Sequence, residues 1–397
     1  MGLFTDTVYR RFSPVVRRRS TGGSAISEPT ESVTSEVEPP AVRPPVRLQY
    51  LDVLRGFAIL LVMLRHAWPN TFPGAGIVGV ALFFGLSGYL ITGLVDRDLN
   101  RFGRPRFARF YLHRIFRLYP ALLLLVIVAT IIQVGILKSP PSLTHALPTI
   151  ASAVFYLSDI PHFFIHLFPL SHLWTLAIEE QFYLVWPVLL WLLFFVTKKL
   201  GRVALVVAIL LTAICITTVA FTIHPANIYQ FATTWASVIA IGGCGYFYRD
   251  RIRAVLSRAG WWPAALAVIV LLAASFFQNA KNLSITYIVG PTLIGLCALV
   301  LIEWATRESH SVVRFPLVKP LRWLGVVSYA AYLWNLPITT WWDEKFSWLP
   351  AWTQVTVLPL TVIAAIVSWF TAEAVGRALR RRFDLWTAAR AAASSTQ

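Results

Sequence analysis

One apolar stretch, LDVLRGFAILLVMLRHAW, carries an arginine and a histidine at a helical spacing. Arg55 and His66 are eleven residues apart, which in an α-helix is three turns and about 20° of rotation, or about 16 Å along the axis. Both side chains would project from one helix face. Ionisable groups in apolar stretches are costly and usually functional, and histidine exchanges protons near neutral pH. The alternatives are an arginine that extends to the membrane surface beside Asp52 and a histidine at the interface.

A second apolar stretch begins with two arginines, Arg114 and Arg117, within FYLHRIFRLYP. Their i, i+3 spacing directs both guanidinium groups to one side of a helix end. Such a pair suits a phosphate-rich ligand, because guanidinium groups donate several hydrogen bonds in a planar fork. The alternative is that both residues are only the positive charges that orient a membrane protein.

Acidic residues follow in a third stretch, SHLWTLAIEEQFYLVWP, which holds His172 and the adjacent Glu179 and Glu180. We expect them at the outer entrance of a helix, on the same side of the membrane as His66. Adjacent carboxylates repel each other, which is expected to raise the pKa of at least one of them. Alternatively, they stabilise the positive end of the helix dipole. In FFGLSGYLIT, Ser87 and Gly88 are small enough for close helix packing, and Ser87 is not expected to be a nucleophile.

Several common catalytic motifs are missing from the sequence. It has no glycine-rich lysine loop for phosphate, no His/Glu zinc motif and no glycine-flanked nucleophilic serine. The three cysteines lie in or beside apolar runs, without metal-ligand or disulfide-framework spacing. We therefore expect neither a metal nor a permanently bound cofactor.

Composition indicates which elements position these residues. The chain has 397 residues, of which 57% are hydrophobic and 13% charged, against roughly 25% charged residues in soluble domains. Apolar runs of about 17–24 residues, separated by polar breaks, are typical of membrane-spanning helices. Ten such runs occur, at approximately 51–67, 76–95, 118–137, 174–197, 203–222, 231–248, 262–277, 285–304, 324–341 and 354–375.

The basic residues predict the orientation, because lysine and arginine in short loops mark the cytoplasmic side. The net charge of +17 is concentrated in a few segments, so membrane topology explains it and no nucleic-acid partner is expected. The expected cytoplasmic loops are 96–117, 198–202 and 249–258, and the expected outer loops are 68–75, 223–230, 278–284 and 342–353.

The stretch between 96–117 and 198–202 must then cross the bilayer an even number of times. Residues 138–172 are therefore expected to form an outer or re-entrant segment. Residues 146–168 are apolar, but Asp159, Pro161, His162 and His166 make a plain span expensive. The sequence thus predicts an all-α, polytopic bundle of about ten transmembrane helices with both termini in the cytoplasm.

Three regions follow from this pattern. Residues 1–47 are basic and then Ser/Pro/Glu-rich, which is typical of a disordered cytoplasmic tail without a signal peptide. Residues 48–376 form the predicted membrane domain. Residues 377–397 are expected to be a basic cytoplasmic C-terminal tail.

After residue 47, nearly the whole chain resembles the acyltransferase 3 family of integral-membrane O-acyltransferases. The family pattern of an arginine and a histidine in the opening helix matches Arg55 and His66, and its Arg-x-x-Arg motif matches Arg114 and Arg117. Three further strings are similar to family motifs: FFGLSGYLIT, SHLWTLAIEEQFYLVWP and LGVVSYAAYLWNLPI.

The resemblance implies a ten-helix enzyme that transfers an acetyl or other acyl group from cytoplasmic acyl-coenzyme A to a hydroxyl group. The acceptor would be a carbohydrate, a glycolipid or another cell-envelope molecule, and the enzyme would reside in the cell membrane. The family's essential residues correspond to His66, Glu179 and Glu180 as the catalytic set and to Arg55, Arg114 and Arg117 as the donor-binding set.

The sequence departs from the family at three positions. Asn335 stands where many relatives have histidine, so no proton-transfer role is assigned to it. His113 replaces an arginine, and Val375 replaces a proline.

The expected mechanism has His66 as general base, oriented by Glu179 or Glu180. The alternative function is a proton-coupled transporter or flippase that makes no bond. A weaker alternative is a non-catalytic membrane scaffold.

Overall fold

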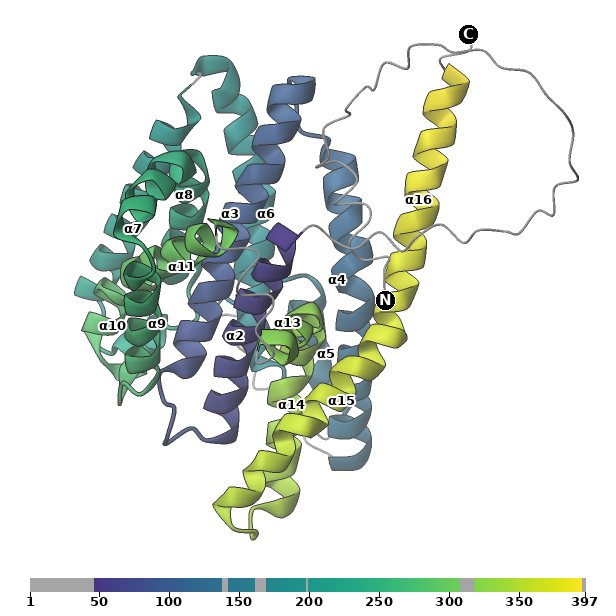
Figure 1. Ribbon diagram of the computed structural model, residues 1–397. Helices are drawn as coiled ribbons and strands as arrows, with labels where there is room; N and C mark the ends of the chain where they lie inside the picture. Colours follow the sequence, from purple (N-terminus) through teal and green to yellow (C-terminus); the bar gives the residue numbers. More distant parts are fainter. Residues whose placement is uncertain (1–45, 138–141, 161–168, 198, 308–317, 395–397) are drawn as a thin grey trace, which may run out of the picture.

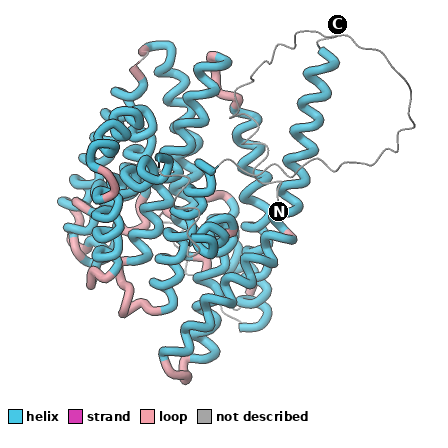
Figure 2. The backbone as a smooth tube through the Cα atoms, viewed as in Figure 1, coloured by secondary structure: helices cyan, strands magenta, loops and turns pink. Residues whose placement is uncertain are grey.

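The computed structural model describes residues 46–137, 142–160, 169–197, 199–307 and 318–394, and within these ranges it contains helices and no β-strand (Figures 1 and 2). Most of the expected N-terminal tail lies outside the described residues. The same is true of His162 and His166 in the expected outer segment. The helices of eight or more residues are α2 (Val46–Ala67), α3 (Ala75–Phe102), α4 (Phe107–Thr130), α5 (Leu143–Val154), α6 (Trp174–Val196), α7 (Leu200–Ala220), α8 (Ala232–Ala259), α9 (Trp262–Ser275), α11 (Gly290–Arg307), α13 (Val318–Val326), α14 (Ser328–Phe346), α15 (Val357–Phe370) and α16 (Ala372–Ser394).

Each of the ten predicted apolar runs contains a helix. Within the described residues, six helices are long and apolar enough to span a membrane, or seven when α8 and α9, bent by 101°, are taken as one span. α2 is outside this set because Asp52, Arg55 and Arg65 interrupt its apolar sequence. The predicted helical membrane bundle is confirmed, whereas the number of ten crossings stays a prediction.

Two of the predicted cytoplasmic loops are largely helical. α3 continues to Phe102 and α4 begins at Phe107, and α8 continues to Ala259. Most of the predicted connecting segments 96–117 and 249–258 are therefore helical extensions of the neighbouring helices, and their cytoplasmic placement stays a prediction. Arginine is a good helix former, so these helices continue where their apolar pattern ends. α3 ends where Gly103 adopts a left-handed φ of 66° and its N–H bonds to the Leu99 carbonyl.

α3 is the central helix of the bundle. It packs against α2, α6, α8 and α11, and 78% of its most apolar window is buried, against 22% in α7. Gly88 permits this packing, because a Cβ atom there would lie 1.8 Å from the Ile239 carbonyl oxygen of α8. The prediction that Gly88 allows close helix packing is confirmed.

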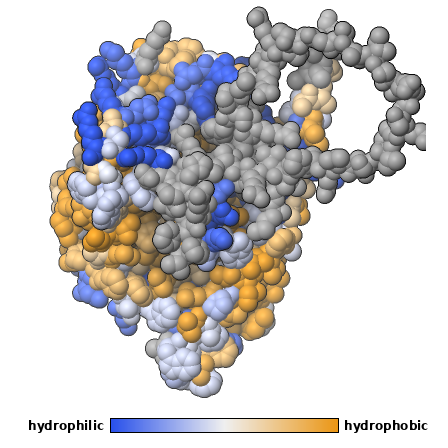
Figure 3. All heavy atoms as spheres, in the orientation of Figure 1, coloured by the Kyte–Doolittle hydropathy of each residue, from blue (hydrophilic) through white to orange (hydrophobic). Residues whose placement is uncertain are grey.

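The two ends of the bundle differ in polarity. The α3–α4 turn lies at the upper end of Figure 1, and the α2–α3 and α14–α15 turns lie at the lower end. Figure 3 shows hydrophilic residues across the upper part of the same face and mainly hydrophobic residues below them. The α3–α4 turn thus lies at the opposite end of the bundle from the α2–α3 and α14–α15 turns, as the topology predicted from the charges requires. Which end faces the cytoplasm stays a prediction.

Two further segments bear on the predicted topology. Residues 143–154 form the short apolar helix α5, which is too short to span a bilayer alone. At the other end of the chain, the described part of the expected C-terminal tail continues α16, which packs along α4. α16 thereby reaches a large cavity within the bundle.

Candidate functional site

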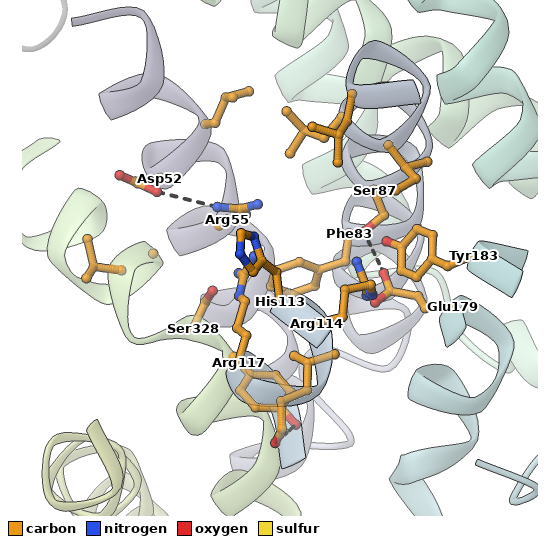
Figure 4. Close-up of a pocket in the computed structure, with 18 of the residues that line it drawn as sticks. Asp52, Arg55, Phe83, Ser87, His113, Arg114, Arg117, Glu179, Tyr183 and Ser328 are labelled. Atoms are coloured by element: carbon orange, nitrogen blue, oxygen red, sulfur yellow. Dashed lines mark hydrogen bonds and ion pairs between the residues drawn. The ribbon is translucent and has the colours of Figure 1, made fainter. Parts of the chain in front are cut away.

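A cavity of ≈ 1450 Å³ opens between α2, α3, α4, α6, α13, α14, α15 and α16 (Figure 4). Nine arginines and five carboxylates contribute to its lining. Positive charge therefore predominates, which favours an anionic ligand. The cavity brings together five of the six predicted site residues: Arg55, Arg114, Arg117, Glu179 and Glu180.

Arg114 is held by an acidic partner from another helix. Its Nε donates to Glu180 Oε2 over 3.2 Å, and its Nη2 donates to Glu180 Oε1. The guanidinium carbon also lies 3.7 Å from the centre of the Tyr183 ring, at a distance typical of cation–π contact. Glu180 thus neutralises Arg114 and fixes it between α4 and α6.

Arg117, one helical turn further along α4, differs from Arg114 in its contacts. Among the residues that the structure describes, it forms neither an ion pair nor a side-chain hydrogen bond, and it is exposed to the cavity (Figure 4). Its charged neighbours are mostly cations, including Arg55 and Arg380, with Glu373 as an acidic neighbour. Arg117 is therefore a guanidinium available to an anion.

Arg55 lines the same cavity from α2. Its Nη1 lies 3.6 Å from Asp52 Oδ1, beyond hydrogen-bonding distance. Within the described residues its guanidinium group forms no side-chain hydrogen bond, which leaves its donors available to a ligand. The main chain at Asp52 is fixed by α13, because a Cβ atom at Gly325 would lie 1.7 Å from the Asp52 carbonyl oxygen. The ion pair between Arg55 and Asp52, which the sequence suggested as an alternative, is present, and both residues line the cavity.

Glu179 turns toward α3. Ser87 Oγ donates a hydrogen bond of 2.7 Å to Glu179 Oε1 (Figure 4). The two carboxylates of the acidic pair thus contact Ser87 and Arg114. Within the described residues, neither is hydrogen-bonded to His66, so the expected orienting role of this pair stays a prediction.

His66 is absent from the lining of the cavity and has a different partner. Its Nδ1 lies 2.5 Å from Asn335 Oδ1. Asn335 is buried, and its Nδ2 donates to Thr361 Oγ1 over 3.3 Å, so its amide oxygen faces His66. The histidine therefore donates from Nδ1–H, which leaves the lone pair of Nε2 available to accept a proton.

Two hydroxyl groups in contact with each other lie in the cavity wall, one of them on the helix that carries Asn335. Thr175 and Tyr332 both line the cavity, and their oxygens are 2.6 Å apart. Tyr332 also donates to the His172 carbonyl oxygen over 2.8 Å. Asn335 follows Tyr332 by three residues on α14. The same helix therefore contributes one residue to the cavity lining and another that contacts His66.

The sequence reasoning missed the contribution of α16. Arg380 and Glu373 line the cavity, and Asp384 Oδ1 accepts from Arg109 over 2.6 Å and lies 3.0 Å from His113 Nε2. The sequence contained a signal for this contribution: Arg380 and Asp384 are four residues apart, which places both on one face of a helix. Assigning this region to a tail hid that signal.

Comparison with known proteins adds an independent line of evidence. Residues 48–373 match the acyltransferase domain family. The chain is 30% identical over 318 residues to YrhL of Bacillus subtilis, which covers 72% of this chain and 48% of the relative. It is 28% identical over 317 residues to the peptidoglycan O-acetyltransferase OatA of Listeria monocytogenes, covering 73% and 49%.

The O-acetyltransferase OatA of Staphylococcus aureus is 27% identical over 356 residues, which cover 82% of this chain and 56% of the relative. The chain thus spans about half the length of the curated relatives it matches. No solved structure matches it. Because the family match extends from α2 into α16 and includes every predicted site residue, the chain belongs to the acyltransferase 3 family of membrane proteins.

Proposed function

We propose that this protein is an integral-membrane O-acyltransferase that moves an acetyl or other acyl group from cytoplasmic acyl-coenzyme A to a hydroxyl group of a cell-envelope carbohydrate or glycolipid. The observation that carries the proposal is the Arg117 guanidinium group, which has no ion-pair partner among the described residues and lines a large, arginine-rich cavity. Family membership supports the reaction class, and the relative named as a peptidoglycan O-acetyltransferase supports a glycan acceptor.

The donor binds through its phosphate groups. Arg117 and Arg55 supply guanidinium groups that can form charge-assisted hydrogen bonds to phosphate oxygens. Arg114, already paired with Glu180, contributes mainly by holding α4 against α6. The apolar part of the lining, which includes Phe84 and Leu176, suits the less polar arm that carries the thioester.

His66 acts as the general base. Its Nε2 accepts the proton of the acceptor hydroxyl while the hydroxyl oxygen attacks the thioester carbonyl carbon. An ester bond forms, the carbon–sulfur bond breaks, and the coenzyme A thiolate leaves and takes up a proton. Asn335 keeps the imidazole in the required tautomer through its bond to Nδ1. The acyl group reaches this base past Tyr332 and Thr175.

The test uses purified protein in vesicles, with acyl-coenzyme A on one side and glycan acceptors on the other. An acyltransferase releases free coenzyme A thiol and forms acylated glycan, whereas a transporter or flippase releases no thiol. We expect His66→Ala to lower kcat about 10²–10⁴-fold, the usual contribution of a general base. Coenzyme A binding by the variant, measured by calorimetry, should match wild type. Absence of thiol release by the folded wild-type protein would overturn the proposal.

A further inference from the structure

Two basic side chains lie near His66 outside the lining of the large cavity. Arg65 immediately precedes His66 in the last turn of α2. Lys281 belongs to the short helix η5 (Ala280–Asn282), in the connection that follows α9. Neither residue lines the cavity, and the mechanism above uses neither of them.

The fold joins these two segments through the α2–α3 turn. The Gly74 N–H donates to the Ser275 carbonyl oxygen over 3.0 Å, and the rings of Phe72 and Phe276 are 5.2 Å apart. A Cβ atom at Gly74 would lie 2.0 Å from the Ala274 carbonyl oxygen. The end of α9 is therefore packed against this turn, which brings η5 to the end of α2.

Lys281 lies over an aromatic cluster, here called the aromatic platform, that consists of Tyr229, Trp174 and Trp235. Lys281 Nζ lies 4.2 Å from the centre of the Tyr229 ring, within cation–π range. Tyr229 itself packs against Trp174, at 5.1 Å, and Trp235, at 6.1 Å. Trp174 adjoins Thr175 of the cavity wall, so this platform extends toward the acyl-transfer path.

The two cations interact electrostatically with each other and with His66. Among the described residues, neither Arg65 nor Lys281 forms an ion pair with a carboxylate or a side-chain hydrogen bond. Burial, together with the charge of Arg65, lowers the pKa of Lys281 to about 8. Cations held near one another without a counter-charge cost free energy, which a bound anion would offset.

We propose that Arg65 and Lys281 form the binding site for an anionic group of the acceptor, a carboxylate or a phosphate, and so present the acceptor hydroxyl to His66. The inference rests on the proposed function and makes its acceptor more specific: an acidic glycan instead of a neutral one. Arg65 supplies the planar donor fork that a carboxylate or phosphate matches, and Lys281 adds a point charge.

The test compares acceptors that differ only in charge. One pair is a β-1,4-linked glycan bearing lactyl carboxylates and its methyl ester, and the other pair is a glycosyl 1-phosphate and the neutral methyl glycoside. Calorimetry with wild type should show at least about tenfold tighter binding of one acidic member, as expected for one charge-assisted contact. The pair that shows this preference identifies the anionic group.

Arg65→Gln and Lys281→Gln should bring the acid-to-neutral affinity ratio close to one, while affinity for the neutral member stays unchanged. Lys281→Arg should retain the preference. The matched control is Lys345→Gln, because Lys345 is an exposed lysine in another expected outer segment. A wild-type protein without preference in either pair, or a preference that survives both glutamine substitutions, would overturn the inference. Thiol release measured on the same samples reports separately on the proposed function.

Discussion

His66 and Asn335 are 269 residues apart in sequence, yet His66 Nδ1 and Asn335 Oδ1 are 2.5 Å apart in space. The contact joins α2 to α14 and gives the histidine a fixed tautomer. The sequence comparison had assigned no proton-transfer role to Asn335, and the structure is consistent with this, because an amide does not exchange protons in this way. Its structural position is instead that of a residue that orients the base.

We expect Asn335→Leu to lower kcat about 10–100-fold, the size of effect known for hydrogen-bond partners that orient metal-bound histidines, because the same kind of orienting contact is lost here. Leucine keeps a similar volume but cannot accept from Nδ1–H. Steady-state assays should show an unchanged KM for the donor. The matched control is Thr361→Val, which removes only the distal contact to Asn335 and should reduce kcat less. A wild-type kcat in Asn335→Leu would refute the orienting role.

Arg117→Ala should weaken coenzyme A binding about 10- to 150-fold, because a charge-assisted hydrogen bond contributes about 1.5–3 kcal/mol. Arg117→Lys should restore only part of the affinity, since lysine cannot make the bidentate fork. Calorimetric titration at fixed salt is the measurement. Thermal stability should change little, because Arg117 has no side-chain partner among the described residues. Unchanged affinity would leave Arg117 as a charge that only orients the protein.

Arg114→Ala should act differently, through stability. It leaves Glu180 without its partner, and we expect a loss of about 1–3 kcal/mol, below the usual cost of breaking a fully buried pair because both side chains are partly exposed. Thermal unfolding in detergent is the measurement. The double variant Arg114→Ala/Glu180→Gln should recover part of the loss, because no unpaired carboxylate remains. Equal stability of all three proteins would show that the pair contributes nothing to folding.

Transfer to an acidic acceptor should depend on pH through Lys281. Its pKa is lowered to about 8, mainly by burial and further by Arg65. Lys281 is charged below this value and neutral above it, so the acceptor KM should rise as pH increases from about 7 to about 9. Tyr229 faces the ammonium group, and Arg65 and His66 are within electrostatic reach. Lys281→Arg should give a flat KM over this range. A pH profile identical to wild type in that variant would assign the titration to another group.

The orientation can be tested with single cysteines in a background free of Cys215, Cys244 and Cys297. Arg104→Cys, in the turn between α3 and α4, should be protected from an impermeant thiol reagent added outside. His145→Cys, in α5, should react, since both side chains are exposed. The reverse labelling pattern would invert the predicted topology. These positions avoid Gly103, whose left-handed φ would strain a cysteine.

The sequence alone determined the helical membrane architecture. Backbone hydrogen bonds in a membrane helix form within one segment, so local apolar runs contain enough information to predict it. The same locality explains why Arg114 and Arg117 were correctly expected on one helix. Helix ends were less predictable, because arginine-rich segments such as 96–102 are compatible with both a helix and a loop.

Only the tertiary structure decided which side chains meet. Glu180 pairs with Arg114 from 66 residues away, and Asn335 reaches His66 from α14, because the packing of α2, α4, α6 and α14 sets the distances between their faces. The two arginines of one motif are chemically alike in sequence, yet one is neutralised and the other is open to the cavity. That distinction depends on which neighbouring helix supplies a carboxylate within hydrogen-bonding distance, and local periodicity contains no information about this choice.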